Sequence, residues 1–437
     1  MSFSALGLCD ELLKAVAEQG YTVASPIQIE AIPAVLSQRD VVAVAQTGTG
    51  KTAGFTLPVL QLLSGGSSAK PKSVRALIIT PTRELAAQVA KSVENYSRLV
   101  NIRSGAAFGG VRIEPQISQL EDGLDVLVAT PGRLIDLYNQ QAINFAQLEI
   151  LVLDEADRML DLGFVNDIHL IQRLLPAKRQ SLLFSATFSK DIKSLAKGML
   201  NNPLMIEVAV PNSTVDTVKQ KIYSVDKARK NELLIHLIKT QNWRQALVFS
   251  RTKQGADSLV TQLEKAGISA ASIHANRTQH ARTHALDGFK NGCVKILVAT
   301  DIASRGIDVD QLPCVVNFDF PYVPEDYVHR IGRTGRAGNS GLAISLFSED
   351  ETKQLQSIER LIGRKLEREI IPAFAPTHKA PSIKAPITKV SNNKKLDNTL
   401  DDDEYGNFEA DPQPNSRGKP QGRAKRASNA SNHKRRK

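Results

Sequence analysis

Residues 45–52 read Ala-Gln-Thr-Gly-Thr-Gly-Lys-Thr and have the composition of a phosphate-binding loop. The two glycines let the backbone turn tightly and bring its N–H groups close to phosphate oxygens. The Lys51 ammonium can reach the β- and γ-phosphates of a nucleotide, and the Thr52 hydroxyl can ligate Mg²⁺. Ala45 stands where such loops usually have their first glycine. The chemistry indicated is the binding of a nucleoside triphosphate with Mg²⁺.

A second candidate site is the acidic run Asp154-Glu155-Ala156-Asp157, which follows the apolar residues 150–153. A carboxylate at such a strand end can hold Mg²⁺, directly or through water, and we assign this role to Asp154. Glu155 is then placed to orient or deprotonate the attacking water. An acidic helix N-terminus would explain one carboxylate here but not three in four residues, so the run favours catalysis.

Two further segments carry polar groups suited to a nucleotide. Gln28 lies just upstream of the glycine-rich loop, and its amide matches the N6/N7 edge of adenine. Residues 329–336 contain one histidine and three arginines: His329, Arg330, Arg333 and Arg336. Arginine can stabilise charge that develops on a γ-phosphate, and no arginine is present in residues 45–52.

The elements that position these groups are short apolar runs that alternate with helical stretches. Unbroken runs of β-branched residues and leucine, each followed by a helix, predict a parallel sheet covered on both faces. Polar clusters follow these runs, and ligands bind beyond the carboxyl ends of parallel strands, so we expect the clusters to line one rim. The predicted strands of the first half are 41–45, 76–80, 126–129, 150–153 and 182–184.

A second alternating series follows and lacks a Gly-Lys-Thr loop, as expected of a duplicated α/β unit. Its predicted strands are 222–225, 246–249, 296–299, 314–318 and 343–347. We therefore divide the chain into an ATP-binding domain (1–208), a linker (209–219), a second α/β domain (220–370) and a tail (371–437).

Composition limits the classes of protein that remain. No apolar run approaches about 18 residues, so we expect no membrane span. The first residues lack a charged segment followed by an apolar one, so we expect no signal peptide. The three cysteines are few and scattered, which favours a reducing cytosol over a disulfide framework or zinc site.

The tail changes the composition of the chain. Residues 371–437 are rich in Pro, Asn, Ser and Lys, and they carry seven of the eleven net positive charges. We interpret this segment as disordered, with a basic end that adds sequence-independent phosphate contacts. The alternatives are a solubilising tail or, in a eukaryotic host, a nuclear-import signal.

Residues 1–370 resemble the DEAD-box RNA helicases in the order and spacing of these segments, and most closely the bacterial RhlE subfamily. The resemblance implies two tandem RecA-like domains and ATP as the substrate, with Mg²⁺. It implies that Phe3 stacks on adenine, that Asp308 contacts the ribose, and that Arg333 and Arg336 are paired arginine fingers. The remaining implied ATP-site residues are Gln28, Ala45, Gln46, Thr47, Gly48, Thr49, Gly50, Lys51 and Thr52. Those implied in coupling ATP hydrolysis to strand separation are Asp157, Ser185, Thr187, His329 and Arg330.

The resemblance also implies contacts with RNA, mainly to its sugar-phosphate backbone. In the first half these residues are Pro81, Thr82, Arg83, Gly109, Gly110, Thr130, Pro131, Gly132 and Arg133. In the second half they are Ser250, Arg251, Arg277, Thr300 and Asp301. Two departures, Ala275 and Ser304, lie outside the proposed chemistry.

The expected function is therefore an RNA-dependent ATPase that opens short RNA duplexes or remodels RNA–protein complexes. A single phosphate-binding loop and a flexible linker suit a monomer, and the cysteine usage suits the cytoplasm. Analogy with RhlE-like proteins suggests a role in ribosome assembly or RNA decay, with ribosomal precursors or decay proteins as partners. Two alternatives remain: an ATP-gated RNA clamp or scaffold in which unwinding is incidental, and a DNA-directed translocase.

Overall fold

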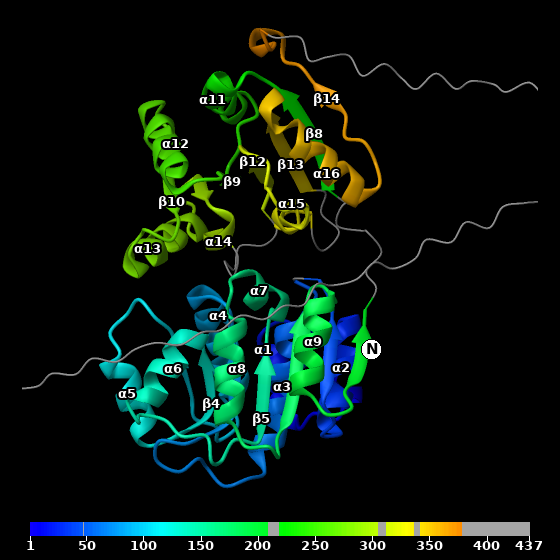
Figure 1. The fold of residues 1–437 in the computed structure, drawn as a ribbon, viewed down its shortest axis with the longest axis vertical. Helices are drawn as coiled ribbons and strands as arrows, with labels where there is room; N and C mark the ends of the chain where they lie inside the picture. The colour runs from blue at the N-terminus through cyan, green and yellow to red at the C-terminus, as the bar shows by residue number, and fades with distance from the viewer. Residues whose placement is uncertain (47, 209–217, 305–311, 336–340, 378–437) are drawn as a thin grey trace, which may run out of the picture. The chain divides into compact units, whose positions relative to one another are not determined.

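The computed structural model describes residues 1–46, 48–208, 218–304, 312–335 and 341–377 (Figure 1). Two parallel sheets of seven strands each organise these residues. We call residues 1–208 the first lobe and residues 218–377 the second lobe. The prediction of two tandem parallel-sheet α/β units is confirmed. Of the predicted linker (209–219), residues 209–217 lie outside the described residues, whereas Val218 and Lys219 begin a strand of the second sheet. Of the tail predicted as disordered (371–437), residues 378–437 lie outside the described residues, whereas residues 371–377 are folded, with Phe374 buried in a short helix.

The first lobe contains the strands β1 to β7 in the spatial order β3-β4-β2-β5-β6-β1-β7. Its strands are β1 Val41–Val44, β2 Val74–Ile79, β3 Ser104–Ala107, β4 Leu124–Ala129, β5 Ile150–Leu153, β6 Gln180–Ser185 and β7 Leu204–Glu207. Its helices are η1 Phe3–Leu6, α1 Asp10–Glu18, α2 Pro26–Leu36, α3 Lys51–Ser64, α4 Arg83–Ser97, α5 Glu114–Glu121, α6 Pro131–Asn139, α7 Ala156–Asp161, α8 Val165–Leu174 and α9 Lys190–Met199.

The second lobe contains the strands β8 to β14 in the order β10-β11-β9-β12-β13-β8-β14. Its strands are β8 Val218–Ser224, β9 Ala246–Phe249, β10 Ala270–Ile273, β11 Ile296–Ala299, β12 Cys314–Asn317, β13 Gly341–Phe347 and β14 Arg368–Glu369. Its helices are η2 Lys227–Arg229, α11 Lys230–Thr240, α12 Lys253–Lys265, α13 Gln279–Lys290, α14 Asp301–Ser304, α15 Pro324–Ile331, η3 Glu349–Glu351, α16 Thr352–Ile362 and η4 Pro372–Phe374.

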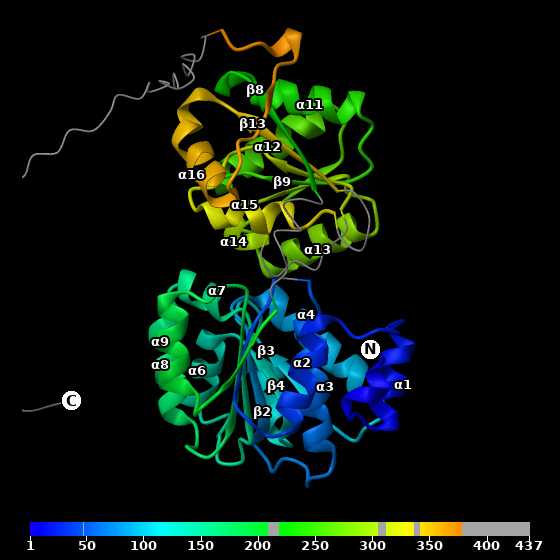
Figure 2. The same cartoon turned by 90° about the vertical axis from the view of Figure 1, so that its right-hand side faces the viewer.

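Hydrophobic side chains cover both faces of the first sheet. Successive residues of a strand point to opposite faces, so Val41 and Ala43 pack on one side and Val42 and Val44 on the other. Helices α1 to α4 cover the first face, and α6, α8 and α9 cover the second (Figure 2). Because both faces are buried, the central strands are apolar throughout, which is the pattern that predicted them.

Four strands were not predicted: β3, β7, β10 and β14. All four are edge strands of their sheets. An edge strand has one neighbour instead of two and is less buried, so its sequence need not be a continuous apolar run. Strand β3, Ser104-Gly105-Ala106-Ala107, illustrates this, since three of its four residues are only partly buried.

No helix among the described residues has both the length and the apolar composition needed to cross a membrane.

Candidate functional site

The phosphate-binding loop predicted at residues 45–52 connects β1 to the first turn of α3, as this type of loop requires. Gly48 and Gly50 have positive φ angles of 77° and 93°, which other residues adopt only with strain. The Lys51 side chain is 6% exposed, and its Nζ donates to the carbonyl of Ala45 at 2.5 Å. Thr49 Oγ1 closes the loop by donating to the carbonyl of Gln46 at 2.7 Å. Thr47 lies outside the described residues.

Gln28 connects this loop to the start of α2. Its Oε1 accepts from the backbone N–H of Ser25 at 2.9 Å, and its Nε2 donates to the carbonyl of Gly50 at 3.1 Å. An amide offers two N–H donors and two acceptor lone pairs, so one of each is left for an adenine edge. Gly50 has no room for a side chain, because a Cβ there would overlap Gln28. The role of Gln28 in reading adenine stays a prediction.

Phe3 lies in η1 and is 5% exposed, packed in the hydrophobic core that contains Leu12 and Val16. Its predicted stacking on adenine would need an open ring face, and the structure gives this role no support. It therefore stays a prediction.

The acidic run begins directly after β5, which is separated from β1 by β6 alone. Asp154 is 2% exposed, and its Oδ1 accepts from the backbone N–H of Glu155 at 3.0 Å. Burial, followed by the charge of Glu155, raises the pKa of Asp154 to about 7, while Lys51 opposes the shift. Burial likewise raises the pKa of Glu155. Such shifts are common at catalytic carboxylates.

Glu155 has a left-handed backbone conformation, with φ 52° and ψ 52°. This conformation costs about 1 to 3 kcal/mol for a residue other than glycine and is concentrated at functional sites. It marks the point where the chain turns from β5 into α7. Lys51 and the pair Asp154–Glu155 thus lie beyond the carboxyl ends of β1 and β5, at the same edge of the sheet, with β6 between the two strands.

Asp157 bonds to the Ser-Ala-Thr segment that ends β6. Its Oδ2 accepts from the N–H of Ala186 at 3.1 Å, the N–H of Thr187 at 3.0 Å and Thr187 Oγ1 at 3.2 Å. Ser185 is fully buried, and its Oγ accepts from the Thr187 N–H at 3.4 Å. The acidic run and this segment therefore form one hydrogen-bonded unit, which is the connection that a coupling role requires.

The predicted RNA-binding residues of the first lobe follow three adjacent strands, β3, β4 and β2. Thr82 caps α4 by accepting from the N–H of Leu85 at 3.3 Å, and Arg83 begins that helix. Gly110, after β3, packs so closely on the Arg83 guanidinium that a Cβ would overlap it. Gly109 precedes it in the same loop. Pro81 and the segment Thr130-Pro131-Gly132 complete this edge of the sheet, at the starts of α4 and α6.

Arg133 has a more internal position than the prediction implies, since it is 9% exposed. Its Nη1 donates to Gln116 Oε1 and its Nη2 to the carbonyl of Val111, each at 2.9 Å. These bonds hold the loop that follows Gly110, so the geometry favours support of this loop over direct contact with RNA.

In the second lobe, Arg330 is the most constrained of the predicted residues. It is 2% exposed, and its Nε and Nη2 form a two-point ion pair with Asp301 at 2.6 and 2.7 Å. Its Nη1 donates to Asn317 Oδ1 at 3.0 Å, and its guanidinium lies 4.8 Å from the centre of the Phe249 ring. Arg330, which was predicted to act in coupling, and Asp301, which was predicted to contact RNA, are thus bound to one another.

This pairing predicts a large effect on stability. Replacing Arg330 with Met removes the guanidinium that binds Asp301 and Asn317, and breaking a buried ion pair costs about 3 to 5 kcal/mol. We expect urea unfolding of the second lobe to show a loss of this size, whereas Arg360→Met on the exposed side of α16 changes the free energy of unfolding by less than about 0.5 kcal/mol. Equal midpoints for the two variants would contradict the ion pair.

Ser250 and Arg251 follow β9, and Thr300 follows β11. Arg251 Nη2 donates to Glu351 Oε1 at 2.7 Å, and its guanidinium lies 4.7 Å from the centre of the Tyr322 ring, which is 70% exposed. Ser250 and Thr300 are largely buried at 1% and 8%. These two are placed to present backbone groups rather than side chains.

Arg277 is held by residues that sequence reasoning missed. Its Nη2 donates to Asp257 Oδ1 at 2.8 Å and to Ser272 Oγ at 2.9 Å. His274 Nε2 lies 2.9 Å from the same Asp257 oxygen. Asp257 lies on α12 and is indistinguishable in sequence from an exposed helical acid, so no pattern indicated its role.

His329 and Arg333 lie at the C-terminal end of α15 and just beyond it. The backbone of Arg333 is fixed on both sides, since its N–H donates to the Arg330 carbonyl at 3.2 Å and its carbonyl accepts from the Leu312 N–H at 3.0 Å. The predicted residues Asp308 and Arg336 lie outside the described residues.

Two family models match the chain: DEAD/DEAH box helicase over residues 25–195, and Helicase conserved C-terminal domain over residues 229–338. The chain belongs to the DEAD-box family of ATP-dependent RNA helicases. Figure 1 shows that the two matched regions fall in separate lobes, the first around β1 to β6 and the second around β9 to β12.

Relatives of this DEAD-box chain align over most of its length. It is 41% identical to ATP-dependent RNA helicase RhlB of Pseudomonas syringae pv. tomato, over 86% of this chain and 95% of that protein. It is 42% identical to DEAD-box ATP-dependent RNA helicase CshA of Geobacillus kaustophilus, over 84% of this chain and 78% of that protein. Among solved structures, S. cerevisiae Dbp5 bound to RNA and ADP BeF3 matches with a TM-score of 0.74 and 32% identity, over 86% of this chain and 95% of that one.

Proposed function

We propose that this DEAD-box chain hydrolyses ATP when RNA is bound and uses the cycle to open short duplexes or to remodel RNA–protein complexes. The observation that carries the proposal is the arrangement of Lys51, Asp154 and Glu155 beyond the carboxyl ends of β1 and β5, which β6 alone separates. Lys51 binds the terminal phosphates, and Glu155 orients the attacking water and accepts its proton.

Mg²⁺ fits this site, because its available protein ligands are the hard oxygens that this ion prefers. Asp154 and Thr52 would hold it, partly through water. Burial and the neighbouring Glu155 carboxylate raise the pKa of Asp154. A divalent cation bound beside Asp154 would stabilise the ionised form of this carboxyl. When bound, the ion neutralises charge on the phosphates.

We further propose that Arg333 and Arg336 reach the γ-phosphate when ATP and RNA are both bound, and that this step bends one RNA strand and separates a few base pairs. Support comes from membership of the DEAD-box family and from the fixed backbone of Arg333. An arginine delivered in this way contributes about 10³- to 10⁵-fold to phosphoryl transfer.

The deciding test compares nucleic acids as activators. Steady-state ATP hydrolysis is measured with the chain alone, with single-stranded RNA and with single-stranded DNA of the same sequence. Stimulation by RNA but not DNA supports the proposal, and equal stimulation by both favours a DNA-directed translocase. Weak unwinding combined with long-lived RNA binding in a non-hydrolysable ATP analogue favours an RNA clamp.

The bonds from Asp157 to residues 186–187 predict that a substitution at Asp157 weakens the coupling between ATP hydrolysis and duplex opening. In Asp157→Asn the charge-assisted hydrogen bonds become neutral ones. This weakens the interaction by about 1.4 kcal/mol, which corresponds to about tenfold in an equilibrium constant. We expect about tenfold more ATP hydrolysed per duplex opened, with RNA-stimulated hydrolysis itself largely kept. Parallel measurement of phosphate release and strand separation gives the ratio, and an unchanged ratio would exclude this role of Asp157.

The finer assignments are proposals from resemblance. We propose membership of the RhlE subfamily, a cytoplasmic location, a monomeric state and a role in ribosome assembly or RNA decay, with ribosomal precursors or decay proteins as partners. Growth defects and RNA-processing intermediates in a strain that lacks the protein are the direct test of the cellular role.

A further inference from the structure

The two sheets have the same strand order when their strands are counted from the start of each lobe. β8 corresponds to β1, β9 to β2, and so on through β14 and β7. Each position at the nucleotide-binding edge of the first sheet therefore has a counterpart in the second. In the first lobe this edge binds phosphate by our proposal, which raises the question of what occupies the same place in the second lobe.

The counterparts can be identified by position. Lys51 is the first residue of the helix after β1, and Lys230 is the first residue of α11, the first α-helix after β8. Asp154 directly follows β5, and Asp319 lies two residues beyond the end of β12. Like Lys51, Lys230 is almost fully buried, at 2% exposure.

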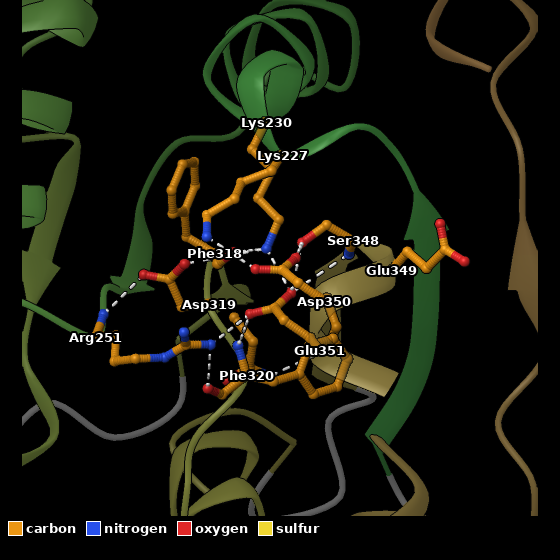
Figure 3. Close-up of polar contacts among 12 residues, drawn as sticks. Lys227, Lys230, Arg251, Phe318, Asp319, Phe320, Ser348, Glu349, Asp350 and Glu351 are labelled. Atoms are coloured by element: carbon orange, nitrogen blue, oxygen red, sulfur yellow. Dashed lines mark hydrogen bonds and ion pairs between the residues drawn. The ribbon is translucent and has the colours of Figure 1, made fainter. Parts of the chain in front are cut away.

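The Lys230 ammonium points at the Glu351 carboxylate, which is also 2% exposed (Figure 3). The Nζ–Oε2 distance is 2.6 Å, and Nζ also donates to the carbonyl of Phe318 at 2.9 Å. The second Glu351 oxygen, Oε1, accepts from Arg251 Nη2 at 2.7 Å and from the backbone N–H of Phe320 at 3.0 Å.

Glu351 receives more donors than a helix cap needs. It closes a capping box with Ser348, whose N–H and Oγ lie 3.3 and 3.2 Å from Oε2. The whole set is a lysine, an arginine, a hydroxyl and two backbone N–H groups. This is the donor set of a phosphate site, in which backbone N–H groups and cations surround an anion.

The neighbouring acids show that the burial of Glu351 is specific. Glu349, Asp350 and Glu351 are consecutive, yet Glu349 points away from the cluster and Asp350 pairs at the surface with Lys227 at 2.8 Å (Figure 3). Among these three acids, Glu351 alone occupies the position in front of Lys230.

We propose that the Glu351 carboxylate stands in for a phosphate group at the nucleotide-site counterpart of the second lobe, and that its removal converts this place into a binding site for phosphate-like anions. Lys230, Arg251 and the N–H groups of Phe320 and Ser348 are the ligands of that site. Glu351 thereby also fixes Arg251, a predicted RNA contact, at the end of β9.

The test uses the full chain with the first-lobe site disabled by Lys51→Ala. Binding of inorganic phosphate and of pyrophosphate is measured for this parent and for the same chain with Glu351→Ala. We expect the double variant to bind at least about tenfold more tightly than the parent. We also expect these anions to raise its thermal midpoint by more than they raise that of the parent, because the general stabilising effect of phosphate acts on both chains.

Glu351→Gln in the same parent is the matched control, because its amide fills the space and leaves no room for an anion. Its response to phosphate should equal that of the parent. If Glu351→Ala binds phosphate and pyrophosphate no better than the parent does, the proposal is wrong.

Glu351→Ala removes the closest acidic partner of the buried Lys230 and leaves it with Asp319 at 4.0 Å, so the variant can lose its fold without an added anion. Refolding yield is then the second readout. Recovery of folded protein in phosphate or formate but not in chloride supports the proposal, whereas equal recovery in all three contradicts it.

Discussion

Glu155→Gln is expected to lower RNA-stimulated ATP hydrolysis by about 10²- to 10⁴-fold, the range typical for loss of a general base. The amide keeps the size of the side chain but cannot accept the proton of the attacking water. The left-handed backbone at Glu155 places this side chain at the turn from β5 to α7, beside Asp154. ATP affinity should stay within a few-fold of the wild type, because Lys51 is untouched.

Phosphate release at saturating ATP and RNA measures RNA-stimulated hydrolysis by Glu155→Gln. Equilibrium binding of a fluorescent ATP analogue measures its ATP affinity. Glu94→Gln makes the same chemical change on α4, where the side chain is 63% exposed, and should leave both unchanged. Wild-type turnover in Glu155→Gln would rule out Glu155 as the base. Joint loss of turnover and ATP binding would point to a disrupted site.

Arg333→Lys is expected to lower turnover by about 10³-fold or more, with ATP binding by the first lobe kept. Lysine preserves the charge, but it cannot present the two-point fork that guanidinium offers to phosphate oxygens. The backbone of Arg333 is held by Arg330 and Leu312, so the substitution changes the cationic group at a position whose backbone stays in place.

Arg360→Lys on α16 is the control and should behave as the wild type. A sharper variant is Arg333→Ala assayed with free guanidinium, which can occupy the vacated space and restore part of the rate. Restoration of turnover by guanidinium but not by ammonium would show that the reaction needs the two-point hydrogen bonding of a guanidinium and not its charge alone. Wild-type turnover in both Arg333 variants would remove this arginine from the mechanism.

The sequence predicted every inner strand of both sheets, because a strand buried on both faces is apolar throughout. It also predicted the main ATP-site groups, because ligands bind at the carboxyl ends of parallel strands and polar residues stand out there. Edge strands such as β3 and β14 were missed, since one-sided pairing imposes no such pattern. Strand β14 is only two residues long, and both are charged.

Partnerships between side chains could not be predicted in the same way. Asp301 and Arg330 were assigned separate roles, yet they bond to each other across 29 residues of sequence. Asp257 and Glu351 look like ordinary helical acids until folding places a cation in front of each of them. Residue type identifies the donor or acceptor, but the partner is set by tertiary packing.

The short strand β14 has a consequence for how the protein behaves when crowded. It pairs with β8 only at Ile222 and Tyr223, so residues 218–221 of β8 have no β14 partner. Among the described residues this part of the edge is open, and such an edge invites strands from other copies, which lysine commonly deters. Lys221 pairs with Glu369 of β14 at 3.0 Å, but Lys219 is exposed, so its charge should oppose edge-to-edge pairing of β8 with β8 of another copy.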